Sequence, residues 1–315
     1  MLPFRNLAVM LGAMALGGCI TTYPDITQSR SPCRMEPGGW CGFVAEAAAK
    51  SYAYAMLSSN AYQDEDEYSE LPAAFLEREA RDNDDSGLAY SVFDRHTVVD
   101  GERGKLLARV IAFRGTEFGS TSDIFSGSLG DSQRKGARMV YASEREHLDA
   151  ENYQDVPIEV TGHSLGGALA TQISIQNKGV KAFVFNTSPF FSGDPMQNDM
   201  DRLSIAERGE FLRILRRYKA PPAADAIVIN CNPSASAGEK HSIRRLADCL
   251  MWIAAYHDEA AYALLGIDDE PVLKPEIECG AADKVHPGPM KLGARRAIES
   301  CVHAPFKKET VSAQD

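Results

Sequence analysis

The 315-residue chain lacks several features that would place it in other protein classes. Positive charge is in deficit, since 33 Lys and Arg stand against 44 Asp and Glu, a formal net charge of −11 at pH 7. This balance argues against a nucleic-acid partner and against electrostatic docking on anionic lipid. No C-x-x-C pair occurs, so neither a redox motif nor a zinc knuckle is indicated. The sequence therefore predicts no metal and no cofactor.

A long apolar run is also missing. The apolar stretch from Leu7 to Leu16 has ten residues, which are too few to span a bilayer. Because Arg5 precedes this stretch and the small residues of L-G-G-C follow it, the pattern is typical of a secretory signal. We therefore divide the chain into a signal peptide at 1–18, a tether at 19–40 and a single domain at 41–315.

The segment L-G-G-C, which ends at Cys19, resembles a bacterial lipobox. This resemblance implies that Cys19 is lipidated, becomes the first mature residue and attaches the protein to a membrane of the bacterial cell envelope. Ile20 follows where Asp would direct retention in the inner membrane, so the resemblance implies the outer membrane. The alternative is a plain signal peptide with an accidental cysteine.

Six cysteines remain besides Cys19. An even number in an exported chain predicts three disulfides, and fifteen pairings are possible in principle. Pairing of sequence neighbours gives 33–41, 231–249 and 279–301. The last 45 or so residues, rich in Pro and Gly, are then a disulfide-tied wrap around the domain.

Strands and helices alternate between residues 89 and 266, which predicts an α/β fold of the α/β-hydrolase type, with a mostly parallel sheet flanked by helices. Apolar alternation or apolar runs predict strands at 88–94, 106–113, 156–160, 180–186, 202–207 and 226–231. Helical spacing predicts helices at 43–62, 131–148, 168–175, 211–218 and 242–266.

One short segment carries the clearest chemical signal. In T-G-H-S-L-G-G, Gly162 and Gly166 flank Ser164 in the pattern G-x-S-x-G, directly after a predicted strand and before a predicted helix. Glycines at these positions permit the sharp strand-to-helix turn that exposes a nucleophilic serine. The backbone N–H of the next residue, Leu165, then lies at a helix N-terminus and is one donor for an oxyanion.

A second motif precedes the first. F-R-G-T ends the strand at 106–113, and together with T-G-H-S-L-G-G it resembles the class 3, fungal-type lipases over residues 89–257. The resemblance implies carboxylic ester hydrolysis, and it implies that Thr116 supplies the second oxyanion donor through its backbone N–H and hydroxyl. Taken alone, Thr116 is also compatible with an ordinary turn threonine.

The general base must be a histidine that follows the serine in the chain. His241 fits best, because it lies in the loop directly after the last predicted strand, where this fold keeps its base. Ser242 is expected to cap the next helix, whose N-terminus favours a neutral imidazole. The other candidates precede the serine, should point away from it, or lie in a helix or the wrap: His96, His147, His163, His257, His286 and His303.

The acid of the triad is less clearly defined. The family resemblance implies an aspartate after the next-to-last core strand, and the acidic residues in this region are Asp194, Asp199, Asp201, Glu207, Glu210 and Asp225. Glu207 and Glu210 lie at the carboxyl edge of the strand at 202–207, so we expect Glu207 to be the acid, with Glu210 in reserve. Alternatively, both glutamates only begin the helix at 211–218.

These residues together predict a serine ester hydrolase that acts on esters or lipids through an acyl-Ser164 intermediate. The rival hypothesis is a catalytically inactive α/β-hydrolase that serves as a lipid-anchored binding or assembly protein.

Overall fold

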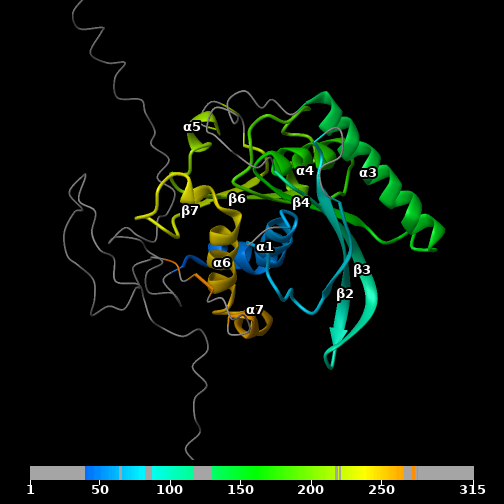
Figure 1. Cartoon of the computed structure of the whole chain (residues 1–315), viewed down its shortest axis with the longest axis horizontal. Helices are drawn as coiled ribbons and strands as arrows, with labels where there is room; N and C mark the ends of the chain where they lie inside the picture. The colour runs from blue at the N-terminus through cyan, green and yellow to red at the C-terminus, as the bar shows by residue number, and fades with distance from the viewer. Residues whose placement is uncertain are drawn as a thin grey trace, which may run out of the picture.

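The computed structural model describes residues 40–63, 66–81, 87–115, 130–216, 219, 221–265, 272–273 and 275. A seven-stranded sheet runs through the middle of the molecule, with the strands in sequence order from β1 to β7 (Figure 1). The strands are β1 (Phe75–Arg81), β2 (Tyr90–Val99), β3 (Glu102–Phe113), β4 (Ile158–His163), β5 (Ala182–Phe185), β6 (Arg202–Glu207) and β7 (Asp225–Ile229).

Five of these strands are parallel. β2 pairs with β1 on one side and with β3 on the other, and both pairs are antiparallel, whereas β3 to β7 all run in one direction. The helices are α1 (Gly42–Asn60), α3 (Asp131–Ala150), α4 (Ser164–Gln176), α5 (Arg213–Arg216), α6 (Ile243–Ala254) and α7 (Glu259–Leu264). The prediction of a mostly parallel sheet flanked by helices, as in α/β-hydrolases, is confirmed.

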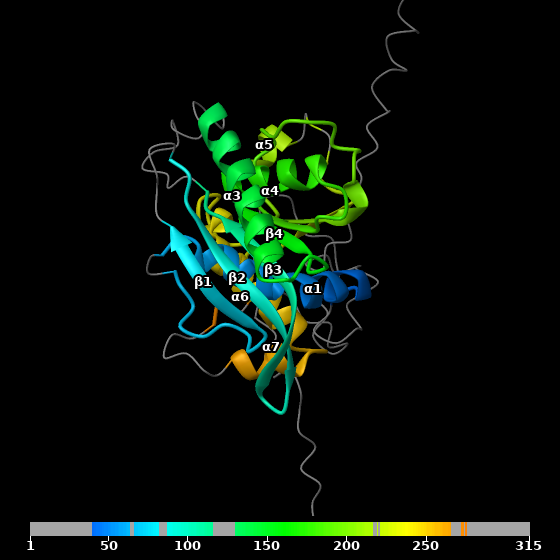
Figure 2. The same cartoon turned by 90° about the vertical axis from the view of Figure 1, so that its right-hand side faces the viewer.

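The helices cover both faces of the sheet. Crossovers between successive parallel strands are right-handed, so α3 and α4 lie on the same face (Figure 2). Helices α1 and α6 pack on the other face, and the buried apolar residues form two clusters, one for each face. The sheet therefore lies between two apolar cores, one on each of its faces.

Helix α1 is buried along most of its length although it carries several serines. Ser51 Oγ donates to the Ala47 carbonyl at 2.7 Å, and Ser58 Oγ donates to the Tyr54 carbonyl at 2.9 Å. Because these hydroxyls bond one turn back within the helix, they can be buried between the sheet and α6.

Helix α3 is mostly polar, and an ion cluster attaches it to the sheet. The guanidinium of the fully buried Arg109 in β3 pairs with Glu144 of α3 at 3.0 Å and with Asp94 of β2 at 2.9 Å. A buried cation needs such partners, because an unpaired charge in the core is strongly unfavourable.

Several element predictions need correction. The helix predicted at 242–266 is two helices, because Asp258 accepts the N–H groups of Ala260 and Ala261 and so begins α7. Ser242 caps α6 as predicted, by accepting the Arg245 N–H. Strand β1 was not predicted: it is a mostly exposed edge strand, and its sequence, F-L-E-R-E-A-R, has no β-branched residue.

A disulfide joins Cys231, just after β7, to Cys249 of α6, with 6.2 Å between the two Cα atoms. This confirms the predicted 231–249 pair. Cys41 is also disulfide-bonded, but Cys33, its expected partner, lies outside the described residues, as do Cys279 and Cys301. The predicted signal peptide, nearly all of the tether and most of the C-terminal wrap lie outside them too.

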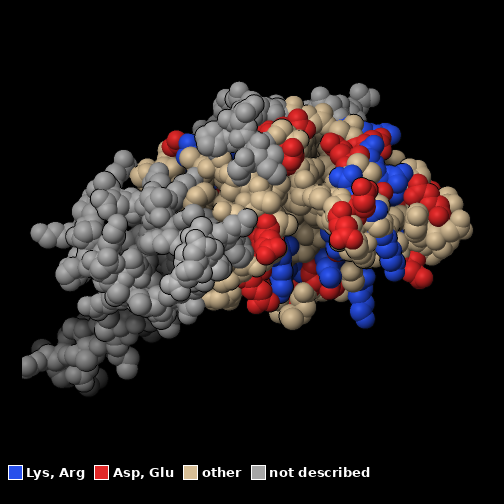
Figure 3. All heavy atoms as spheres, turned by 90° about the horizontal axis from the view of Figure 1, so that it is seen from below, with Lys and Arg blue, Asp and Glu red and all other residues tan. Residues whose placement is uncertain are grey.

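Acidic and basic side chains are interleaved on the face that Figure 3 shows. Ion pairs at the surface follow the same pattern, for example Lys50 with Glu46 and Arg145 with Asp149. Among the helices that the structure describes, none is both long and apolar enough to cross a membrane.

Candidate active site

Ser164 occupies a strained turn between β4 and α4. Its φ angle is +55°, a left-handed conformation that is unfavourable for a residue with a side chain. The turn is possible because a Cβ on Gly166 would lie 2.0 Å from the carbonyl oxygen of Phe113, and one on Gly162 would lie 2.5 Å from Gly166. The glycines of the motif therefore permit the close backbone contacts that the turn requires.

Ser164 and His241 meet at the carboxyl edge of the sheet. The Oγ atom of Ser164 lies 3.0 Å from Nε2 of His241, which is in the short 3₁₀ turn Glu239–His241 after β7. On the other side of the ring, Nδ1 lies 2.8 Å from Oε2 of Glu210. A carboxylate only accepts, so Nδ1 carries the proton and Nε2 is free to accept from the serine hydroxyl. This is the donor order of a Ser-His-acid triad.

The acid that faces the imidazole is Glu210, the reserve candidate, and not Glu207. Glu207 instead accepts the backbone N–H groups of Cys231 at 3.1 Å and Asn232 at 3.0 Å, which ties the end of β6 to the end of β7. The expectation that Glu207 pairs with the base is therefore wrong. The reason is a turn at Gly209, where φ is +87°, which redirects the chain so that Glu210 points at the ring.

Glu210 is held by three donors. Its Oε2 accepts the Leu212 N–H at 2.8 Å as well as the imidazole N–H, and its Oε1 pairs with the guanidinium of Arg216. Arg216 also donates to the Thr187 carbonyl at 2.9 Å, so it links the acid to the loop after β5. Several charge-assisted bonds of this kind fix the position of a buried carboxylate.

The environment of His241 favours the neutral form. Burial lowers the pKa of this imidazole below its ordinary value of 6.5, and Arg216 lowers it further, whereas Glu210 opposes the shift. The ring of Phe211 packs against His241 with 4.1 Å between the centroids. A neutral imidazole next to a serine hydroxyl has the state that a general base needs.

Only part of the predicted oxyanion site lies among the described residues. Leu165 follows Ser164 in the first turn of α4, whereas Thr116 lies outside the described residues. The strand end that leads to Thr116 does lie beside the serine, since a Cβ on Gly115 would be 3.2 Å from the Ser164 Cβ. The Ser188 N–H, after β5, donates to the Ser164 carbonyl at 2.9 Å and braces the turn.

His163 has a contact that sequence reasoning missed. Its side chain is buried and bonds to the Tyr62 hydroxyl and to the backbone carbonyl of His241. Burial holds the pKa of His163 well below 6.5, and the neighbouring His241 adds to this effect. No local pattern marks this role, because Tyr62 and His241 are distant in the sequence.

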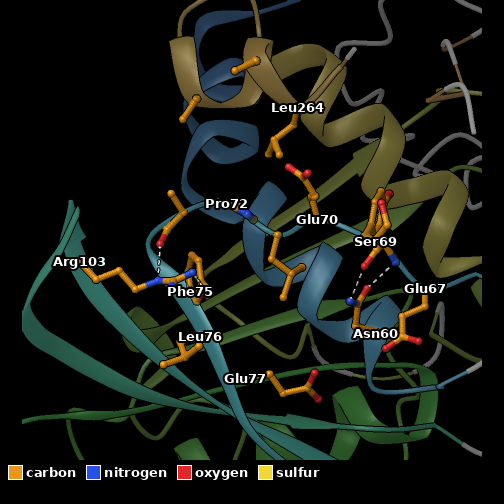
Figure 4. Close-up of a pocket in the computed structure, with 15 residues that line it drawn as sticks. Asn60, Glu67, Ser69, Glu70, Pro72, Phe75, Leu76, Glu77, Arg103 and Leu264 are labelled. Atoms are coloured by element: carbon orange, nitrogen blue, oxygen red, sulfur yellow. Dashed lines mark hydrogen bonds between the residues drawn. The ribbon is translucent and has the colours of Figure 1, made fainter. Parts of the chain in front are cut away.

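A separate hollow of about 1050 Å³ lies between α1, α7 and the start of β1 (Figure 4). Arg103 reaches across it to the carbonyls of Ala73 and Phe75, and no triad residue lines it. In the part of the chain that the structure describes, no group of three or more His, Cys, Asp or Glu side chains is arranged to hold a metal ion.

Comparison with known families adds an independent finding to this geometry. Residues 44–199 match the phospholipase-like family, described as the Tle-like phospholipase domain. The chain is thus similar to phospholipase-like domains over just under half of its length, a range that contains Ser164 but ends before Glu210 and His241. The match supports a lipase-like relationship without specifying the class 3 lipases. No curated protein matches the chain.

The lowered pKa of His241 predicts how catalysis depends on pH. A histidine that serves as general base acts only when neutral, so with His241 in that role the second-order rate constant for ester hydrolysis should fall as pH decreases through the pKa of His241. Because burial depresses that pKa, the acid limb should have its midpoint below 6.5. A kcat/KM profile between pH 4.5 and 8 measures it, and a midpoint clearly above 6.5 would contradict the described environment.

The two glutamates should respond differently to the same substitution. Glu210→Gln removes the charge that orients and stabilises the imidazolium, so kcat should fall by several powers of ten. Glu207→Gln places an NH₂ group against one of two backbone donors, so it should lower the free energy of unfolding by about 1–3 kcal/mol. Turnover of each folded variant and its denaturant unfolding curve test both effects. Equal kcat for the two folded variants would refute the assignment of Glu210.

Proposed function

We propose that this protein is a serine hydrolase that cleaves carboxylic esters of lipids. The observation that carries the proposal is the hydrogen-bonded chain from Ser164 through His241 to Glu210, with the serine on a strained turn. The similarity of residues 44–199 to phospholipase-like domains supports lipids as the substrate class. The triad chemistry and the family similarity therefore lead to the same reaction.

The proposed reaction has two halves. Ser164 Oγ attacks the ester carbonyl carbon while its proton passes to Nε2 of His241, and Glu210 stabilises the resulting imidazolium. The Leu165 N–H, together with Thr116, stabilises the oxyanion of the tetrahedral intermediate. The intermediate then loses the alcohol, which takes the proton from His241, and an acyl-Ser164 ester remains. Water, deprotonated by His241, attacks this ester in the second half, and the fatty acid leaves as His241 returns the proton to Ser164 Oγ.

Release of fatty acid from a defined lipid tests this function. We expect the wild-type protein to hydrolyse phosphatidylcholine dispersed in detergent and simple p-nitrophenyl esters, and we expect Ser164→Ala to lose nearly all of this activity. His147→Ala is the matched control, because His147 is an exposed histidine on α3. If the folded wild-type protein hydrolyses neither substrate, the alternative of an inactive lipid-anchored binding protein replaces the proposal.

We also propose that the mature protein is anchored in the bacterial outer membrane by a lipid on Cys19. The support is the lipobox-like sequence L-G-G-C, which follows a short apolar stretch. An acylated N-terminal cysteine would hold the hydrolase at a membrane surface, where its lipid substrate is concentrated.

A lipid anchor on Cys19 predicts that substitution of this residue changes how the protein divides between the membrane and soluble fractions. Cys19→Ser removes the thiol that would carry the lipid, so the expressed protein should leave the membrane fraction of the bacterial host. Fractionation followed by immunoblotting measures the distribution, with the wild-type protein as the reference. A variant that stays fully in the membrane fraction would refute lipidation at Cys19.

A further inference from the structure

His163, which directly precedes Ser164, lies between two groups that are far apart in the sequence. Nε2 of His163 is 2.7 Å from the backbone carbonyl oxygen of His241, and Nδ1 is 2.7 Å from the hydroxyl of Tyr62. The two imidazole rings are 4.6 Å apart between centroids. His163 is therefore adjacent to the base of the triad, although the triad itself does not include it.

The hydrogen-bond partners determine the tautomer of His163. A carbonyl oxygen only accepts, so Nε2 must carry the proton and donate it to His241. The unprotonated Nδ1 then accepts the hydroxyl proton of Tyr62. The Tyr62 hydroxyl therefore holds the far side of the ring whose Nε2–H bonds to His241.

We propose that His163 and Tyr62 form a positioning pair, in which His163 fixes the backbone of the catalytic base and the tyrosine hydroxyl holds the ring of His163 in place for that bond. The inference rests on the proposed hydrolase function. It assigns no proton transfer to either residue, because neither one is expected to contact the substrate carbonyl.

The bond matters because His241 lies in a single 3₁₀ turn within a loop. Its carbonyl also accepts from Asn186 Nδ2 at 3.3 Å, but the bond from His163 is shorter. Together they fix the Cα from which the imidazole extends toward Ser164. A displacement of about 1 Å at a catalytic group is sufficient to reduce the rate substantially.

Tyr62 also contacts the oxyanion side of the site. A Cβ on Gly115 would be 2.6 Å from the Tyr62 hydroxyl, and the Arg114 guanidinium donates to the Tyr62 carbonyl at 3.1 Å. The residue that holds the ring of His163 thus packs against the strand end that leads to Thr116. Tyr62, which lies just after α1, therefore contacts both His163, which supports His241, and the backbone of Gly115 beside Ser164.

The first test is kinetic. Tyr62→Phe removes only the hydroxyl, so we expect kcat for a p-nitrophenyl ester to fall about tenfold with KM unchanged, as for a group that acts on the transition state alone. His163→Ala should cost more, and Tyr62→Phe should have little further effect in the His163→Ala protein, because the two residues act as one unit.

A matched control separates positioning from stability. Tyr68→Phe removes another buried hydroxyl, whose partner at 2.6 Å is Asp248 of α6. We expect both tyrosine variants to lower the melting temperature, and only Tyr62→Phe to lower kcat. Equal kcat values in Tyr62→Phe and the wild-type protein would overturn the proposal, as would equal losses of kcat in Tyr62→Phe and Tyr68→Phe.

The second test does not depend on turnover. Nitrogen NMR of ¹⁵N-histidine-labelled protein at pH 7, with His163 assigned through His163→Gln, should show the Nε2–H tautomer for His163. Tyr62→Phe should perturb that signal and the Nδ1–H signal of His241. An Nδ1–H tautomer for His163, or an unchanged His241 signal in Tyr62→Phe, would overturn the positioning pair. A protein that shows the expected tautomers but hydrolyses no ester would retain the pair and refute the hydrolase function.

Discussion

The left-handed backbone of Ser164 is the constraint on which the rest of the site depends. A residue with a side chain adopts φ near +55° only where the surrounding structure compensates for the strain. Here β4 enters the turn from the middle of the sheet, and α4 leaves it so close to β3 that Gly166 contacts the backbone of Phe113. The buried strands and helix thus hold the hydroxyl at the carboxyl edge.

The loops after the neighbouring strands place the remaining groups around that hydroxyl. Asn186, just after β5, donates to the carbonyls of Lys240 and His241 and accepts the Glu207 N–H at 2.8 Å. Glu207 in turn accepts the N–H groups that follow β7. The loop with Glu210 and the loop with His241 are therefore connected through bonds from side chains to the backbone, as well as through the pair of Glu210 with His241. Such support gives a triad its fixed geometry before substrate binds.

The parts of the site that depend on local sequence were predictable. The position of Ser164 follows from glycine spacing between a strand and a helix, and His241 follows from chain order. Strand β6 was predicted to the residue because its apolar pattern is regular. The choice between Glu207 and Glu210 was not predictable, because it depends on the left-handed turn at Gly209. The presence of a glycine in the sequence does not show which way the chain turns there. The bond from His163 to His241 depends wholly on tertiary packing.

The most direct test of the central claim is covalent labelling of Ser164. A fluorophosphonate reacts with a serine only when a neutral base activates the hydroxyl and an oxyanion site receives the phosphonyl oxygen. Intact-mass and peptide mass spectrometry of the folded protein should show one adduct, on Ser164, and Ser164→Ala and heat-denatured protein should show none. A folded protein that remains unlabelled at Ser164 after prolonged exposure would contradict the account.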